Sequence, residues 1–317
     1  MSVLVTGPDT LLGFHVLREA VESGLSPRTF ARQGDELRIE ALGATVAAGS
    51  TADLESCLLA LEGATAVFHC ESGRLSSSSA QDQGGAFLEG TRNLLVAMAR
   101  VGVEDLIYCG SAFTFKPGTV AEPGDETTRW DNPSGLLAVK VLAAAGDLVQ
   151  RYNEDGKVRC VTVSPTLPAG PGGPPDGAFR AAIEAVRAGA RWAGGGMNVV
   201  RAQDAAAAAV RALGRGKAGE SFILAGENVQ AARLVSGIEG ALQAGGAVAR
   251  EEVPAHRRGL FTKRGDRGRG AGEEIELLLQ AGMYYSPARA VDRLGLAVTP
   301  FEETVREAVA SYLSENA

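Results

Sequence analysis

The sequence is poor in the residues that build metal sites and disulfide frameworks. It has four cysteines and three histidines among 317 residues, and the cysteines stand far apart without a CxxC pair: Cys57, Cys70, Cys109 and Cys160. Metal-ligand spacing is therefore absent, and we expect no metal site. Because three of the four cysteines lie in or beside apolar runs, we expect buried, reduced thiols.

Excess positive charge, long apolar runs and a leader segment are also missing. Lysine and arginine number 31 against 38 aspartates and glutamates, so the net charge is −7 and nucleic acid is an unfavourable partner. No apolar run approaches the roughly 20 residues of a membrane-spanning helix. The first apolar run begins at once, without the basic segment and cleavage site of a signal peptide. We expect a cytoplasmic protein with no membrane or nucleic-acid partner.

The sequence does contain a regular alternation of short apolar runs and helical patterns as far as Pro165. Strands are predicted at 2–7, 28–32, 44–49, 65–70, 105–111 and 158–165, and helices at 12–23, 53–62, 90–102 and 140–153. Such alternation is typical of a parallel sheet with helices on both faces. The predicted class is α/β, with a Rossmann-like doubly wound parallel sheet whose ligands lie over the carboxyl ends of the strands.

The alternation breaks after Pro165, where the stretch LPAGPGGPPDG predicts a loop. Two further strands, MNVV and SFILAG, follow within a mainly helical remainder. We assign residues 1–166 and 198–227 to the doubly wound domain, and residues 167–197 and 228–317 to a smaller C-terminal substrate lobe. The basic, glycine-rich stretch from His256 to Gly272 is either a solvated loop or a lid that binds anions.

The first strand runs into a loop that is similar to a dinucleotide-binding turn. VTGPDTLLG keeps Gly7 for the turn and Gly13 for close packing of helix on strand, and the helix N-terminus offers amide groups to a phosphate. Thr10 stands where a third glycine would leave the backbone bare. A β-branched residue is costly there if the position requires a positive φ. We expect Gly7, Thr10, Leu11, Leu12 and Gly13 to line the phosphate site, with weakened affinity.

Five segments along the chain resemble one family. They are VTGPDTLLG, EGTRNLLVAMARVGVEDLIYCGSA, VSPTLPAGPG, GGGMNVVRAQDAAAAAVRAL with GESFILAGEN, and YYSPARAVDRLGLAVTPFEETVREAV. In this order they resemble the extended short-chain dehydrogenase/reductase superfamily (NAD-dependent epimerases/dehydratases). The branch with dihydroflavonol-reductase-like proteins and hopanoid-associated sugar epimerases is the most similar. The resemblance runs nearly from end to end and implies the fold predicted above.

The resemblance also implies roles for individual residues. In this family a tyrosine protonates the carbonyl that receives hydride, and a lysine four residues later holds the nicotinamide ribose. Lys140 matches the lysine and Ser111 matches the serine that orients the carbonyl, but Leu136 stands at the place of the tyrosine. Arg32 ends the second predicted strand, where relatives that prefer NADP have a cation for the 2′-phosphate. Lys140 is therefore assigned to the catalytic site and, together with Arg32, to the cofactor site.

Several departures from the family pattern point away from an ordinary cofactor site. Phe87 replaces an asparagine, Ser50 replaces an acid near the adenine, and Cys70 and Glu71 replace alanines. The carboxylates of Glu71 and Asp9 would lie close to a pyrophosphate, which is electrostatically unfavourable. The sequence leaves two alternatives open: NADP(H) is bound weakly, or the protein works without a cofactor.

Loss of the tyrosine indicates chemistry other than hydride transfer. We expect Lys140, poorly hydrated in a pocket lined by Leu136 and Phe87, to act as a general base or as a cation beside an enolate, with Ser111 and His69 nearby. An apolar site favours a small organic, secondary-metabolite-like substrate that undergoes isomerisation, cyclisation or elimination.

Two other functions stay open at this stage. One is an NADP(H)-dependent carbonyl reductase with an unconventional proton donor, and the other is a non-catalytic NADP(H) sensor or scaffold. By analogy with the family, a homodimer would form through the helices predicted near 84–101 and 140–153.

Overall fold

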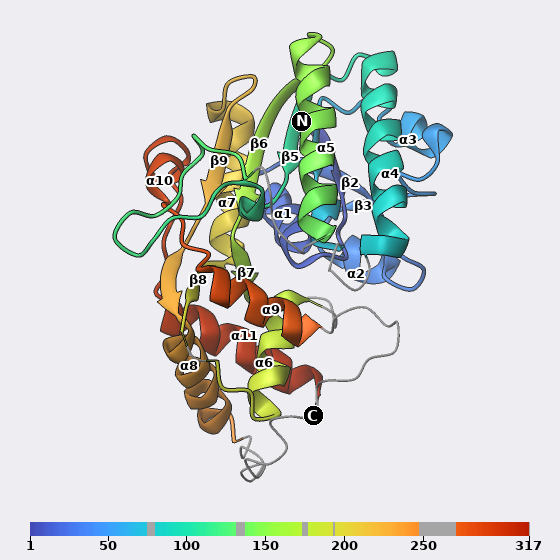
Figure 1. Cartoon of the computed structure of the whole chain (residues 1–317). Helices are drawn as coiled ribbons and strands as arrows, with labels where there is room; N and C mark the ends of the chain where they lie inside the picture. The colour runs from blue at the N-terminus through green and yellow to red at the C-terminus, as the bar shows by residue number, and fades with distance from the viewer. Residues whose placement is uncertain (75–79, 131–136, 173–176, 193, 247–270, 317) are drawn as a thin grey trace.

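The larger part of the molecule is built around a seven-stranded parallel sheet (Figure 1). The computed structural model describes residues 1–74, 80–130, 137–172, 177–192, 194–246 and 271–316. The strands are β1 (Ser2–Thr6), β2 (Ser26–Phe30), β3 (Thr45–Ala47), β4 (Ala66–His69), β5 (Asp105–Cys109), β6 (Arg159–Pro165) and β9 (Ser221–Leu224). Their order is β3-β2-β1-β4-β5-β6-β9, and every neighbouring pair is parallel. The Rossmann-like doubly wound sheet predicted from the sequence is confirmed.

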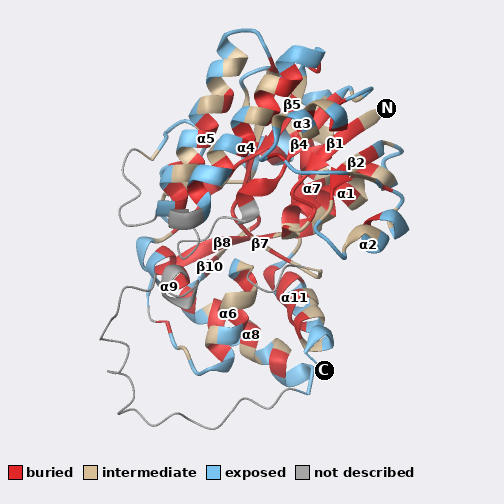
Figure 2. Ribbon diagram, turned by 90° about the vertical axis from the view of Figure 1, so that its right-hand side faces the viewer, coloured by how far each residue is buried: buried red, intermediate tan, exposed pale blue. Residues whose placement is uncertain are grey.

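Helices cover both faces of this sheet. One face packs against α1 (Leu11–Glu22), α2 (Glu36–Ala41), α7 (Ala202–Arg215) and α10 (Ala288–Leu294), and the other against α3 (Leu54–Ala60), α4 (Ala80–Val101) and α5 (Leu137–Glu154). Successive strand residues therefore enter different cores: in β5, Ile107 faces α1 and α7, whereas Leu106 and Tyr108 face α4 and α5. Figure 2 shows the central strands buried, as expected for a parallel sheet covered on both faces.

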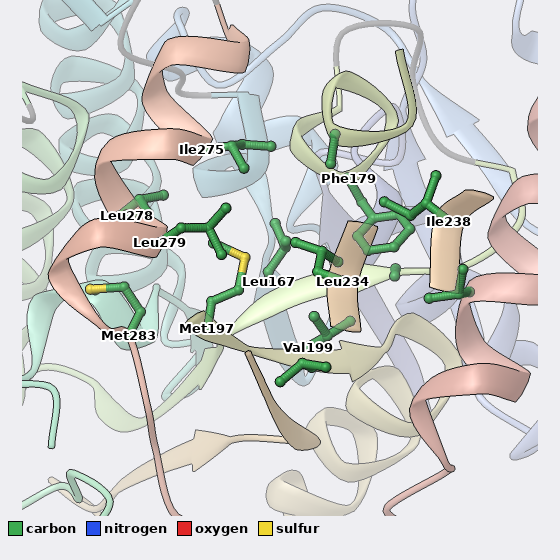
Figure 3. Close-up of a cluster of buried hydrophobic side chains, with 14 of the residues drawn as sticks. Leu167, Phe179, Met197, Val199, Leu234, Ile238, Ile275, Leu278, Leu279 and Met283 are labelled. Atoms are coloured by element: carbon green, nitrogen blue, oxygen red, sulfur yellow. The ribbon is translucent and has the colours of Figure 1, made fainter. Parts of the chain in front are cut away.

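A second, three-stranded sheet begins the lower part of the molecule. It has the order β10-β8-β7, formed by β7 (Leu167–Ala169), β8 (Gly196–Arg201) and β10 (Glu227–Gln230). Helices α6 (Ala178–Arg187), α8 (Ala231–Ala244), α9 (Ala271–Ala281) and α11 (Phe301–Glu315) pack beside it. Figure 3 shows their shared core, where Leu167, Met197, Leu234 and Leu279 converge.

Two of these short strands were not predicted from the sequence. Residues 167–169 were expected in a loop and residues 227–230 in a helical region, yet both segments pair with β8. A three- or four-residue strand is specified by its partner more than by its own composition, so pairing outweighs the weak local signal. Strand β2 also ends at Phe30, so Arg32 follows the strand by two residues instead of ending it.

A buried asparagine joins the two sheets where the chain passes between them. Thr166 lies between β6 and β7, and its hydroxyl donates to Oδ1 of Asn198 at 2.7 Å. The same Oδ1 accepts from the amide of Gly226 at 2.8 Å, and Nδ2 donates to the Gly226 carbonyl at 3.1 Å. Asn198 is fully buried, and both its amide oxygen and its amide nitrogen are hydrogen-bonded. These bonds hold the segments at Thr166 and Gly226, where the chain passes between the two sheets, in fixed positions relative to one another.

Two features named in the sequence analysis lie outside the described residues: Leu136, and residues 256–270 of the basic stretch. In the part of the chain that the structure describes, no helix has both the length and the apolar character to cross a membrane.

Candidate functional site

The loop between β1 and α1 is built for close backbone contact. Gly7 has φ +69°, a conformation that glycine adopts at no steric cost. A Cβ on Gly7 would lie 2.8 Å from the carbonyl carbon of Cys70 and 2.9 Å from the amide nitrogen of Glu71. The loop therefore rests on the segment that follows β4, at the carboxyl edge of the sheet.

Thr10 does not block this loop in the way the sequence suggested. Its φ is −91° and its ψ 156°, so no positive φ is required, and the expectation of backbone strain at this residue is wrong. The side chain is 2% exposed and turns inward: Oγ1 accepts from the amide of Gly13 at 2.9 Å. The hydroxyl also lies 2.9 Å from the carbonyl O of Gly7 and 3.2 Å from that of Cys70, to which it donates. Thr10 is the N-cap of α1.

The inward position of Thr10 leaves the outer side of the loop to the backbone. Leu11 and Leu12 are the first two residues of α1, whose amides have no acceptor within the helix itself. An N-terminus of this kind favours an anionic group through its N–H donors and the helix dipole. The positions predicted for the phosphate site thus lie in one loop: Gly7, Thr10, Leu11, Leu12 and Gly13. Within it, Thr10 holds the loop in shape through its cap.

The cap can be tested by two substitutions at Thr10. Thr10→Val keeps the shape but removes the acceptor for Gly13 and the donor for Gly7, and should lower the free energy of unfolding by about 1–3 kcal/mol. Thr10→Ser keeps the hydroxyl and should stay within about 1 kcal/mol of the wild type. Urea denaturation of both variants checks this. Equal losses in Thr10→Val and Thr10→Ser would contradict a capping role.

Asp9 and Arg32 form an ion pair across the loop. The Nε of Arg32 lies 2.6 Å from Oδ2 of Asp9, and the carboxylate side chain is 7% exposed against 66% for the arginine. From the sequence, Asp9 was expected only to repel a pyrophosphate and Arg32 only to offer a cation to a 2′-phosphate. Because β1 and β2 are neighbouring parallel strands, residues just beyond their carboxyl ends meet at one edge. That adjacency was the signal that could have predicted the pair.

Glu71 is also held by a neighbour. It follows β4 in the short 3-10 helix η1 (Glu71–Arg74) and is 5% exposed. The hydroxyl of Thr51 lies 3.1 Å from Oε1 and 2.9 Å from Oε2 of this carboxylate. The side chain is therefore directed to the segment after β3, and a hydrogen-bond donor that sequence reasoning missed, Thr51, offsets part of its charge.

His69 has a structural position in the α4 core. It is 1% exposed; its Nδ1 lies 2.7 Å from the Thr6 hydroxyl and its Nε2 3.0 Å from the Thr91 hydroxyl. The Thr91 hydroxyl donates its proton to the Phe87 carbonyl, so its oxygen accepts from Nε2–H, and Nδ1 accepts from Thr6. With both ring nitrogens hydrogen-bonded to the protein, His69 does not present a nitrogen to a substrate.

Ser111 and Lys140 come from β5 and α5. Ser111 follows β5, is half-buried, and its Oγ accepts from the Phe113 amide at 3.3 Å as the cap of the 3-10 helix η2 (Ala112–Thr114). Lys140 lies in the first turn of α5, which packs against η2. The lysine is exposed, and no carboxylate of the described residues lies within 4 Å of its Nζ.

The apolar pocket expected around Lys140 is not the one the sequence suggested. Phe87 is 7% exposed and stacks on His69, with ring centroids 6.0 Å apart. It therefore belongs to the core between the sheet and α4, and its proposed role in lining a pocket for Lys140 is wrong. Lys140 itself is exposed, so the poorly hydrated setting that the sequence analysis expected for it is not what the structure shows.

None of the five tyrosines, all of which the structure describes, stands four residues before Lys140 in the sequence. Tyr108 is buried on the α4 and α5 side, and burial raises the pKa of its phenol. Tyr285 is buried and donates to the Phe115 carbonyl at 3.1 Å, while Tyr284 is in the same strand-like segment. Tyr152 lies near the end of α5, and Tyr312 on α11. Tyr285 lies near η2, with its ring centroid 6.4 Å from that of Phe113, and its hydroxyl is already hydrogen-bonded to the Phe115 carbonyl.

The four cysteines are free and buried. Sγ of Cys70 lies 3.3 Å from Sγ of Cys109, and burial raises the pKa of Cys70 well above its usual range. Within the described ranges, no group of three or more histidine, cysteine, aspartate or glutamate side chains is placed to hold a metal ion.

Comparison with known proteins places this architecture in a family. The model of the NAD dependent epimerase/dehydratase family matches residues 3–225. A search of curated proteins gives no match. The solved structure of gox2253 is 25% identical, with a TM-score of 0.79 over 99% of this chain and 98% of the other.

Two less similar solved structures show the same fold. A nucleoside-diphosphate-sugar epimerase from Pseudomonas aeruginosa is 22% identical, with a TM-score of 0.75 over 99% of this chain and 98% of the other. The UDP-glucose 4-epimerase of Thermus thermophilus, solved with NAD, is 20% identical, with a TM-score of 0.76 over 99% of both chains. With the family match over residues 3–225, the glycine loop and the strand order, the chain belongs to the NAD dependent epimerase/dehydratase family.

Proposed function

We propose that this chain binds a nicotinamide dinucleotide and converts a small apolar organic substrate by isomerisation, cyclisation or elimination, without tyrosine-assisted hydride transfer. One contrast supports this most directly: the loop from Gly7 to Gly13 keeps the close packing of a phosphate loop, whereas Leu136 stands where the family resemblance places the tyrosine. The family description supplies isomerisation, by epimerases, and elimination, by dehydratases, and Leu136 at the place that the resemblance gives to the tyrosine argues against tyrosine-assisted hydride transfer.

The residues present fit a dinucleotide. The Gly7 loop and the amides of Leu11 and Leu12 would face the pyrophosphate, Arg32 the adenosine ribose, and Lys140 the nicotinamide ribose. The two carboxylates that the sequence analysis took as unfavourable each have a partner, Arg32 for Asp9 and Thr51 for Glu71. When bound, such a cofactor supplies a hydride donor or acceptor.

Ser111 and Lys140 supply the polar groups for the substrate. A cation and a hydroxyl directed at one oxygen would stabilise an enolate or carboxylate as charge develops on it. Two half-buried aromatic side chains lie here: Phe113 within η2, and Trp130, whose amide donates to the Thr114 carbonyl; both pack against the core of the second lobe. Their partly exposed rings beside Ser111 favour an apolar substrate over a highly hydroxylated one.

Lys140 provides the test of this proposal. Lys140→Met should weaken NADH binding at least tenfold, which corresponds to about 1.4 kcal/mol, because the substitution removes the cation that would face the nicotinamide ribose. The melting temperature should not change, because the side chain is exposed. Calorimetric titration with NADH measures the affinity. Lys157→Met is the matched control, since Lys157 is 51% exposed and follows the far end of α5.

The same preparations decide on the chemistry. NADH or NADPH mixed with simple ketones and aldehydes should show no oxidation above background, because general acid catalysis is typically worth about 10²–10⁴-fold and no tyrosine supplies it. Robust carbonyl reduction would contradict the proposal, as would unchanged NADH affinity in Lys140→Met.

A further inference from the structure

The end of β2 is where a dinucleotide site of this fold meets the 2′ position of the adenosine ribose. A carboxylate there hydrogen-bonds a free 2′-hydroxyl, whereas an arginine accommodates a 2′-phosphate. Arg32 lies two residues beyond β2 and no acid ends the strand itself. Taken alone, Arg32 predicts a preference for NADP(H), which is the expectation that the sequence analysis stated.

The structure adds a carboxylate to this position from another element. Asp9 belongs to the phosphate loop between β1 and α1, and its Oδ2 is 2.6 Å from the Nε of Arg32. The Asp9 side chain is 7% exposed, so the loop fixes its place, whereas the arginine side chain is 66% exposed and reaches in from the surface. A group that contacts this guanidinium therefore also approaches the Asp9 carboxylate.

This arrangement has opposite consequences for the two cofactors. A 2′-phosphate has a charge near −2 and would compete with Asp9 for Arg32 while being repelled by the carboxylate at short range. A neutral 2′-hydroxyl has a proton to donate and can give it to the carboxylate. The ion pair thus weakens the binding of a 2′-phosphate and strengthens the binding of a 2′-hydroxyl.

We infer that Asp9 makes the site select NAD(H) over NADP(H), by neutralising Arg32 and taking the place of the acid that β2 lacks. The inference rests on the proposed function, because it concerns the cofactor of the same site. It reverses the expectation drawn from Arg32 alone.

The test is the ratio of the dissociation constants for NADPH and NADH, measured by calorimetric titration of the full chain. We expect the wild type to bind NADH at least tenfold more tightly. Asp9→Asn should lower this ratio at least tenfold, because it frees Arg32 for the 2′-phosphate and removes the repulsion. Arg32→Gln should raise the ratio, because it leaves the carboxylate without this cation.

Asp35→Asn is the matched control. Asp35 precedes α2 at the same edge, and its side chain makes no capping hydrogen bond, so the substitution changes the net charge equally while leaving the Asp9–Arg32 ion pair and the backbone hydrogen bond from Asp35 to the Arg32 carbonyl in place. We expect the ratio to stay within twofold of the wild type. Circular dichroism verifies that each variant is folded, and the opposite shifts in Asp9→Asn and Arg32→Gln give two independent readings.

The outcomes separate this inference from the proposed function. A wild type that prefers NADPH, or a ratio unchanged in both Asp9→Asn and Arg32→Gln, would overturn the inference while leaving dinucleotide binding in place. An equal shift in Asp35→Asn would also overturn it, by showing a general charge effect. A wild type that binds neither cofactor at millimolar concentration would overturn the proposed function and, with it, the inference.

Discussion

Gly13→Ala is expected to lower the free energy of unfolding by about 3 kcal/mol or more, although helix propensity alone predicts a gain of about 1 kcal/mol for this substitution. A Cβ on Gly13 would lie 1.9 Å from the carbonyl O of Gly7 and 2.8 Å from Oγ1 of Thr10. The first of these atoms belongs to the backbone and cannot rotate away. The phosphate loop must therefore open, which breaks the Thr10 cap and should also abolish dinucleotide binding.

Gly85→Ala is the matched control for this prediction. Gly85 lies within α4, and a Cβ there would meet nothing within 4 Å. The same substitution should therefore stabilise the protein by up to about 1 kcal/mol through helix propensity. Urea denaturation of the two variants measures the difference. A Gly13→Ala protein as stable as Gly85→Ala would show that the loop tolerates expansion and that close packing at Gly13 is unimportant.

The long elements were predictable because their signals are local and repeated. Alternating apolar runs and helical patterns predicted six of the parallel strands as far as Pro165, and β9 followed from SFILAG. The strands β7 and β10 depend on pairing with β8, which no pattern within three or four residues expresses. Helix ends were less predictable: α5 begins at Leu137, three residues before the predicted start.

The candidate site was predictable as a set of positions but not as a set of contacts. Gly7 and Gly13 were identified from their spacing, and the structure gives both the tight packing that spacing implies. Thr10 was misjudged because a residue type does not reveal its own φ or the direction of its side chain. Asp9 was misjudged because its effect depends on Arg32, which is distant in sequence and adjacent only through the pairing of β1 with β2.

Phe87 shows a further limit of sequence reasoning. Its match to a family position suggested that it lines the site beside Lys140, but side chains on a buried helix face pack against the nearest strand. Here that neighbour is His69 on β4, and the two rings stack with an interplanar angle of 10°. An aligned position predicts where the backbone lies, whereas burial decides which way the side chain turns.

His15 should make the protein lose stability at a higher pH than its carboxylates do. It lies on α1, is 1% exposed, and its Nε2 donates to the carbonyl O of Pro171 at 2.9 Å. Burial lowers the pKa of His15 from 6.5 to about 4. The hydrogen bond to the Pro171 carbonyl raises this pKa in part, and the Arg18 and Arg201 guanidiniums lower it further. The Glu307 carboxylate has a smaller raising effect on the pKa.

The sign follows from proton uptake. The unfolded chain protonates this histidine as the pH falls through 6.5, whereas the folded protein does so only near 4. Between these values the unfolded state binds more protons, so the free energy of unfolding decreases by up to about 1.4 kcal/mol per pH unit and about 3 kcal/mol in all. Carboxylates whose pKa is lowered by hydrogen bonds or ion pairs lose their contributions in a lower range: Asp53, Asp125, Glu220 and Glu302.

His15→Gln isolates the contribution of this histidine. A glutamine can still donate from Nε2 to the Pro171 carbonyl but does not titrate. Between about pH 7.5 and pH 4, the wild type should lose about 3 kcal/mol more of its free energy of unfolding than the variant, as measured by urea denaturation at several pH values. Glu126, whose pKa burial raises, contributes in the opposite direction, but it is present in both proteins and cancels in the difference. If the two proteins lose stability in parallel, the imidazole is not the group that titrates, because the substitution would have removed it without changing the slope.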